Sequence, residues 1–153
     1  MENITFGHIF WVALWAGIIG TVGMEIVLQS ITKSGMANAD MTRAIGSLFT
    51  KSYSNSYKIG FVLQTFSGIV FAFIYTLAFV LFDVKGFLSC AGAGVLIGFI
   101  HGAVVGFILV AAIAENHPLP EFRQAGFSVA VAHWAGHLVY GLLVGIIISL
   151  IGF

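Results

Sequence analysis

The sequence predicts an all-α integral membrane protein in which four helices cross the bilayer as one bundle. Hydrophobic residues make up 59% of the 153 residues and charged residues only 8%, against roughly 25% in a soluble domain. Mean hydropathy is +1.06. Four apolar stretches reach the length of about 20 residues that a helix needs to cross the hydrocarbon core. The length suits a single transmembrane domain over residues 1–153.

The four predicted spans cover residues 9–31, 59–82, 87–114 and 127–150. The first span lacks a basic N-terminal region and a small-residue cleavage motif, so we expect a retained helix and not a signal peptide. The second and third spans are joined by a predicted tight turn at residues 83–86.

The two longer links, after the first span and before the fourth, contain different sequence features. Asn38 and Asp40 can cap a helix start after the first span. The apolar residues that follow recur at helical spacing, which predicts a short amphipathic helix at the membrane interface; these residues are Met41, Ile45, Leu48 and Phe49. Pro118 and Pro120 prevent the last link from being one continuous helix. That link could act as a lid or docking site, or simply as an interfacial turn, which we favour.

Basic residues are unevenly divided between the two ends of the predicted spans. Lys85 is the only one on the side of the termini. The others lie in the two long loops: Lys33, Arg43, Lys51, Lys58 and Arg123. Because cytoplasmic loops carry the excess of Lys and Arg, we expect the long loops in the cytoplasm and both termini outside.

Small residues mark the helix faces that we expect to pack. Helices in lipid associate without a hydrophobic driving force, so glycine allows their backbones to approach closely. The third span carries a four-residue ladder of Gly94, Gly98, Gly102 and Gly106. The ladder predicts tight helix contact and gives no evidence for catalysis. The single cysteine, Cys90, excludes an internal disulfide and reads as an apolar packing residue.

Polar side chains inside the spans are the strongest functional signal. His133 and His137, in the run HWAGH, are four residues apart and share one helical face. Ionisable groups at membrane depth are costly and indicate a functional site. Counting 1.5 Å per residue places all of the following in the same half of the bilayer, on inward faces: Glu25, Gln64, His101, His133 and His137.

Three interpretations of these residues stay open. The first is a buried hydrogen-bond network formed by the same five residues and Tyr140. The second is a metal site with Glu25, His101, His133 and His137 as candidate ligands, or a haem held by His101 and one of the other two histidines. The third is passage of protons or a small solute. Neither HExxH nor CxxCH occurs, since position 134 is Trp.

A faint internal repeat relates the two halves of the chain. Residues 63–71 run parallel to residues 132–140, which sets Gln64 opposite His133 and Gly68 opposite His137. Two duplicated hairpins would produce this pattern, and chance is the alternative.

The run ENHPLPEFRQAGFSVAVAHWAGHLVYGLLVG at residues 115–145 is similar to a group of small uncharacterised prokaryotic four-helix membrane proteins. MTRAIGSLFTKS at 41–52 and IYTLAF at 74–79 also resemble that group. The resemblance implies the fold and a prokaryotic inner (cytoplasmic) membrane, and implies no activity. The group is expected to carry His at position 64, where this chain has Gln64, and that departure weakens the metal hypothesis.

The composition favours a small non-catalytic subunit that packs within a larger membrane complex or a homo-oligomer. The sequence has no nucleotide-binding motif and no soluble domain, and its net charge of zero gives nucleic acid no electrostatic footprint. We expect lipid and other membrane subunits as partners, and no catalysis. The alternative is a cofactor-binding or proton- or solute-relaying protein built around the histidines.

Overall fold

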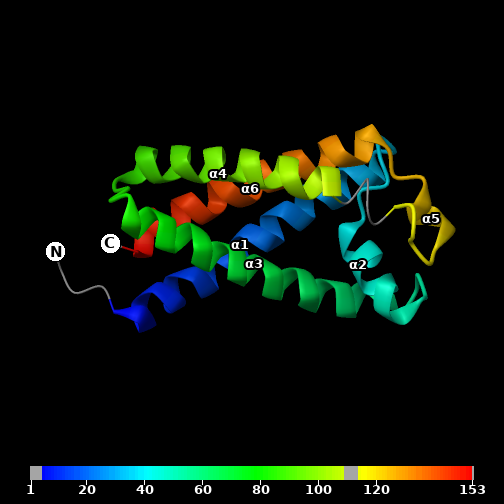
Figure 1. The fold of residues 1–153 in the computed structure, drawn as a ribbon, viewed down its shortest axis with the longest axis horizontal. Coiled ribbons are helices and arrows are strands. Elements are labelled where there is room, and N and C mark those ends of the chain that lie inside the picture. Colours follow the sequence, from blue (N-terminus) through cyan, green and yellow to red (C-terminus); the bar gives the residue numbers. More distant parts are fainter. Residues whose placement is uncertain (1–4, 109–113, 153) are drawn as a thin grey trace.

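The computed structural model describes residues 5–108 and 114–152, which form helices and no strand (Figure 1). Six helices follow one another: α1 (Phe6–Lys33), α2 (Met41–Thr50), α3 (Ser56–Leu81), α4 (Phe87–Ile108), α5 (Pro120–Arg123) and α6 (Phe127–Ile151). Of these, α1, α3, α4 and α6 are long and apolar enough to cross a membrane. The all-helical class and the four candidate spans are therefore confirmed.

The helix bounds differ from the predicted ones by a few residues at most ends. The third predicted span is the exception, because α4 is described to Ile108 and residues 109–113 lie outside the described residues. Ala114, the predicted end of that span, lies in a turn. Gly86 adopts φ +82° between α3 and α4, a conformation that suits glycine at the predicted tight turn.

The four long helices lie in the spatial order α3, α1, α6, α4. Helix α4 packs along α6, α6 along α1, and α1 along α3, whereas α3 and α4 make few contacts although they are consecutive in the chain (Figure 1). From their connecting turn, α3 and α4 diverge toward the end that carries α2. The backbones of α3 and α4 therefore form a V (Figure 1). We call the space between them the α3–α4 opening; the Phe71, Tyr75 and His101 side chains fill its narrow part.

Glycines permit the closest helix contacts. All four residues of the predicted ladder are buried on α4, and a side chain at Gly94 or Gly98 would collide with α6 backbone at Gly141 or His137. Helix α1 approaches α3 in the same way, since a Cβ on Gly17 would lie 2.5 Å from Ile69 Cα. Small residues thus set the spacing of both helix pairs.

Helix α2 begins with the predicted cap and packs on α3. The Asp40 side chain accepts a hydrogen bond from the Arg43 N–H at 3.0 Å. Gly46 of α2 lies directly against backbone at the start of α3. The predicted apolar face is split: Met41 is buried and Ile45 half-buried, while Leu48 and Phe49 are exposed. The innermost face of α2 instead carries small and polar residues, namely Thr42, Gly46 and Ser47.

The link before α6 folds back onto α2. It contains the short helix α5, which the sequence did not predict and which starts at Pro120, a position where a missing N–H costs nothing. His117 is fully buried, and its Nε2 donates to the Ala44 carbonyl of α2 at 3.0 Å. Phe122 packs edge to face on the His117 ring. The described part of this link is thus docked on α2 by a buried histidine.

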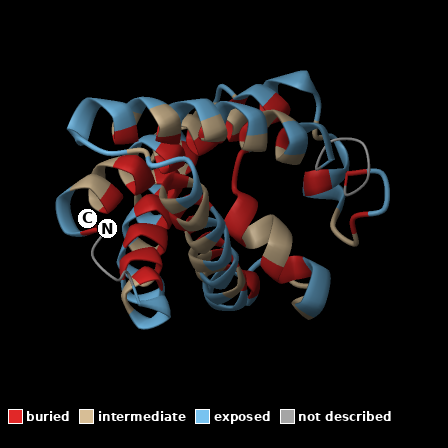
Figure 2. Cartoon of the chain, turned by 60° about the vertical axis from the view of Figure 1, so that its left-hand side comes forward, coloured by how far each residue is buried: buried red, intermediate tan, exposed pale blue. Residues whose placement is uncertain are grey.

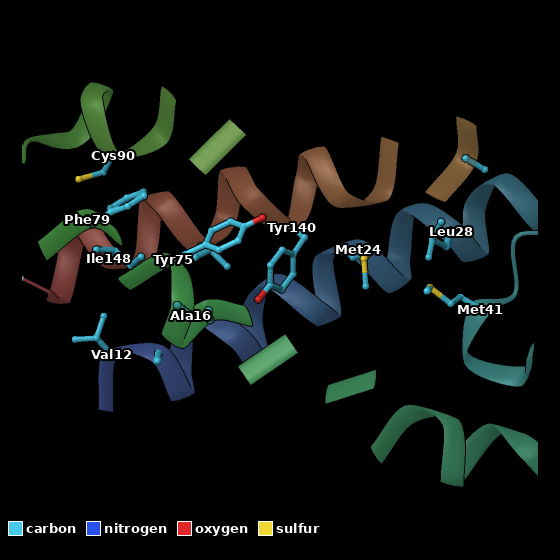
Figure 3. Packing of buried hydrophobic residues seen from close by; sticks show 14 of the residues in the cluster. Val12, Ala16, Met24, Leu28, Met41, Tyr75, Phe79, Cys90, Tyr140 and Ile148 are labelled. Atoms are coloured by element: carbon cyan, nitrogen blue, oxygen red, sulfur yellow. The ribbon is translucent and has the colours of Figure 1, made fainter. Parts of the chain in front are cut away.

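Buried residues line the facing sides of the helices and exposed residues cover the outside (Figure 2). The outer surface carries many large apolar side chains, including Phe66, Leu88 and Phe107, as expected of a surface that faces lipid. The end of the core near the chain termini contains Val12, Phe79, Cys90 and Ile148 (Figure 3). The other end contains Met24, Leu28 and Met41, and Tyr75 and Tyr140 lie between the two ends.

Candidate functional site

In the structure most of the predicted polar residues form two separate clusters, and two clefts lie beside them. Glu25 and Gln64 belong to one cluster, and His101, His137 and Tyr140 to the other. His133 belongs to neither. All lie on the side of the terminal apolar core where α2 is found.

The first group, which we call the acid cluster, joins α1, α2 and α3. Thr42 Oγ1 lies 2.6 Å from Glu25 Oε2 and 2.8 Å from Gln64 Oε1, and Gln29 Nε2 donates to Glu25 Oε1 at 3.0 Å. Glu25, Thr42 and Gln64 are all buried. In the described part of the chain Glu25 has no Lys, Arg or His partner. The carboxyl group is thus held by neutral hydrogen-bonding groups.

Counting hydrogens limits the arrangement of this cluster. The Thr42 hydroxyl has one hydrogen but lies close to two oxygens, so one neighbour must donate to it. Either Glu25 is the neutral acid and donates to Thr42, which then donates to Gln64, or the Gln64 amide turns and its Nε2 donates to Thr42. In the second arrangement the Gln64 carbonyl oxygen, and not its amide nitrogen, would lie 3.4 Å from Glu25 Oε2.

Sequence reasoning missed Thr42, because it assigned α2 by its apolar residues. Thr42 and Gly46 are four apart and form a stripe of small side chains about 100° around the helix from Met41 and Ile45. A Thr–x–x–x–Gly stripe of this kind was the available signal.

The second group, which we call the ring cluster, joins α3, α4 and α6. The His101 and His137 rings pack edge to face with centroids 4.7 Å apart, and Phe71 covers His101 at 4.0 Å. His101 Nδ1 lies 3.1 Å from the Tyr75 hydroxyl, while its buried Nε2 has no partner among the described residues. Tyr140 donates to the Gly68 carbonyl of α3. The cluster therefore bridges the narrow part of the opening between α3 and α4.

His133 and His137 have the same local geometry. Nδ1 of His133 lies 2.7 Å from the Val129 carbonyl, and Nδ1 of His137 lies 2.8 Å from the His133 carbonyl. A carbonyl only accepts, so each Nδ1 carries the hydrogen and each neutral ring has a lone pair on Nε2. Neither Nε2 has a hydrogen-bond partner in the part of the chain that the structure describes. Both rings can therefore accept a hydrogen bond or a proton.

Two clefts adjoin these rings. The first, the loop cleft, has a volume of about 230 Å³ and is lined by the segments before α2 and α6, by α2 and by His133. The second, the central cleft, has a volume of about 180 Å³ and lies in the V between α3 and α4. Its polar lining is Gln64, Ser67, His101, His137 and Tyr140. Met41 lines both clefts.

The metal and haem hypotheses gain no geometric support. Among residues 5–108 and 114–152, no three His, Cys, Asp or Glu side chains are placed to hold one metal ion. Glu25 is bonded within the acid cluster, while His133 and His137 adjoin different clefts. The rings of His101 and His137 contact each other directly, with no space between them for a macrocycle.

Comparisons with known proteins assign no family to this chain. Neither the family models, nor the curated proteins, nor the solved structures give a significant match. The functional argument therefore depends on the two clusters, the two clefts and the opening between α3 and α4.

Proposed function

We propose that the protein is a small non-catalytic membrane subunit whose α3–α4 opening receives a helix of another chain. In this proposal α1, α3, α4 and α6 cross the cytoplasmic membrane of a prokaryote. The loops with α2 and α5 face the cytoplasm, because they hold most of the Lys and Arg residues. The other chain belongs to a larger complex or is a second copy.

The observation that carries this proposal is the polar lining of an opening that faces lipid. Ser67 is exposed near the middle of α3, and His101 of α4 is only half-buried. Both lie where a spanning helix meets hydrocarbon, and polar groups at that depth normally face protein or a cavity. A neighbouring helix laid along the V would cover both and contribute hydrogen-bonding groups to them.

Helices α3 and α4 have room for such a neighbour. Among the four long helices they are the least buried within the chain. Ile45 and Val105 add apolar edges to the cleft, so an incoming helix meets an apolar rim around a polar centre. This is the arrangement expected of a contact between membrane helices.

Site-specific photo-crosslinking in native membranes tests the proposal. A photoreactive residue at Ser67 is expected to give one defined adduct whose crosslinked peptide is a membrane-spanning helix. The control is the same residue at Val22, which is exposed on α1. Val22 lies near the level of Ser67, since its neighbour Thr21 contacts Gly68.

The mass of the adduct separates the two kinds of partner. A product of twice the 16.3 kDa chain mass indicates a homo-oligomer, and any other defined mass indicates a different subunit. Crosslinks to lipid only, or the same products from positions 67 and 22, would overturn the proposal.

A further inference from the structure

We infer that the loop cleft and the central cleft form one inlet that brings water, and with it protons, from the α2–α5 end to the ring cluster. Met41 lies where the two clefts meet and forms the constriction of the inlet, which slows the passage of water but does not stop it. The central cleft is also the opening that the proposed partner helix would cover, but this inference concerns how that cleft joins the loop cleft and not what covers it from outside.

The geometry of Met41 and the two histidines joins the clefts. Met41 is 8% exposed and lines both clefts from α2. On the other side, His133 lines the loop cleft and His137 the central cleft. These rings are about 6 Å apart along α6, or roughly one helical turn. The only described side chain shared by the two linings is thus a methionine, which has three rotatable bonds and adapts its shape.

The linings become less polar along the inlet, as expected of a path from water into the membrane. Polar side chains of the loop cleft include Asn38, Asp40, Glu121, Gln124 and Ser128. Arg43 neutralises Asp40 through a contact of 3.2 Å. Further in, the central cleft has only neutral polar groups and histidines, with Glu25 behind Gln64. Volumes of about 230 and 180 Å³ admit water molecules.

The inlet ends near the middle of the bundle. Beyond Tyr75 and Tyr140 the core is packed by Val12, Phe79 and Ile148, which are almost fully buried (Figure 3). The buried Thr76 hydroxyl at this end is bonded to the Ala72 carbonyl of its own helix. A proton that arrives on water would bind the free Nε2 of His137, leaving a water molecule and an imidazolium whose Nδ1 stays on the His133 carbonyl. Among the described residues, the inlet therefore leads from the α2–α5 end to the ring cluster.

Thiol accessibility tests the inlet in the full chain, reconstituted in lipid nanodiscs with Cys90→Ala as background. A water-soluble methanethiosulfonate reacts with the thiolate and so only where water reaches the side chain. Val105→Cys lines the central cleft, and the control Val104→Cys is its neighbour on the outer face of α4. We expect Val105→Cys to react about tenfold faster than Val104→Cys, because only the cleft admits water that supports the thiolate.

Variants of Met41 test where the inlet is constricted. Met41→Ala should speed the reaction of Val105→Cys by about tenfold, because more water reaches the thiolate through the loop cleft. Met24→Ala is the matched control, since Met24 is equally buried but lines the central cleft alone. Met24→Ala should leave the rate within about twofold of the background, because a larger cavity does not connect the clefts.

Either of two results would overturn the inference. One is equal reactivity of Val105→Cys and Val104→Cys in the background with native Met41, which needs no further substitution and so does not depend on a variant folding. The other is a rate at Val105→Cys that Met41→Ala and Met24→Ala change equally, with circular dichroism confirming that both variants are helical. Neither result bears on crosslinking from Ser67, so the subunit proposal is tested separately.

Discussion

Replacing Gly98 with alanine tests how closely α4 and α6 approach each other. A Cβ at this position would lie 2.5 Å from the His137 carbonyl oxygen and 3.2 Å from Gly141 Cα. Both atoms are backbone and cannot turn aside. The helices would have to separate by about 0.9 Å to reach 3.4 Å, where ordinary contact begins, and a gap of that size forfeits a quarter to a half of the attraction between facing atoms.

The expected cost follows from two opposing effects. Overpacking a tight contact costs about 1–3 kcal/mol, while alanine gains up to about 1 kcal/mol over glycine in a helix. We expect Gly98→Ala to lower the free energy of unfolding by about 1–2 kcal/mol. Gly92→Ala is the control on the same helix, because a Cβ added there would have no neighbouring atom within 4 Å. It should be neutral or slightly stabilising.

Unfolding by denaturing detergent in mixed micelles, followed by circular dichroism, measures both variants against the parent chain. The ranking is the critical result. If Gly98→Ala is as stable as Gly92→Ala, the α4–α6 contact is looser than described, and the account of how glycine sets the helix spacing is wrong.

Three further predictions follow from the polar contacts and the charge distribution. Thr42→Val should lower the free energy of unfolding by about 1–3 kcal/mol, because it leaves buried acid-cluster groups unpaired. Thr42→Ser keeps the hydroxyl and should retain most of the parent stability; equal losses for the two variants in the same micelle assay would contradict this role. His117→Ala should free the link before α6 from Ala44 and raise its rate of limited proteolysis, and unchanged cleavage would show that the histidine does not anchor it. In intact cells, Ser54→Cys should resist a membrane-impermeant thiol reagent while Asp83→Cys reacts; the reverse pattern would invert the proposed orientation.

The sequence was sufficient to predict the four long helices, because helix length and hydropathy are local properties. It also predicted the Asp40 cap of α2 and the tight turn before α4, since both depend on a few adjacent residues. It did not predict the spatial order of the helices. That order depends on which glycine faces meet, and a ladder on one helix does not name its partner.

The candidate site was predicted in part for the same reason. Depth along the helices correctly grouped polar residues toward one end, and Gln64, His101 and His137 do line one cleft. Depth could not show that Glu25 faces α2 and α3, because that depends on helix rotation. It also could not show that Thr42 completes the acid cluster, since α2 lies outside the spans from which polar residues were counted.

The mass of the particle released from native membranes by a mild detergent tests the central claim most directly. The subunit proposal predicts a defined particle heavier than the 16.3 kDa chain, and predicts that Ser67→Trp, which fills the opening between α3 and α4, releases the chain from it. Val22→Trp on the exposed face of α1 should leave the particle intact. A monomer from the unaltered chain, or a particle that Ser67→Trp does not change, would contradict the claim.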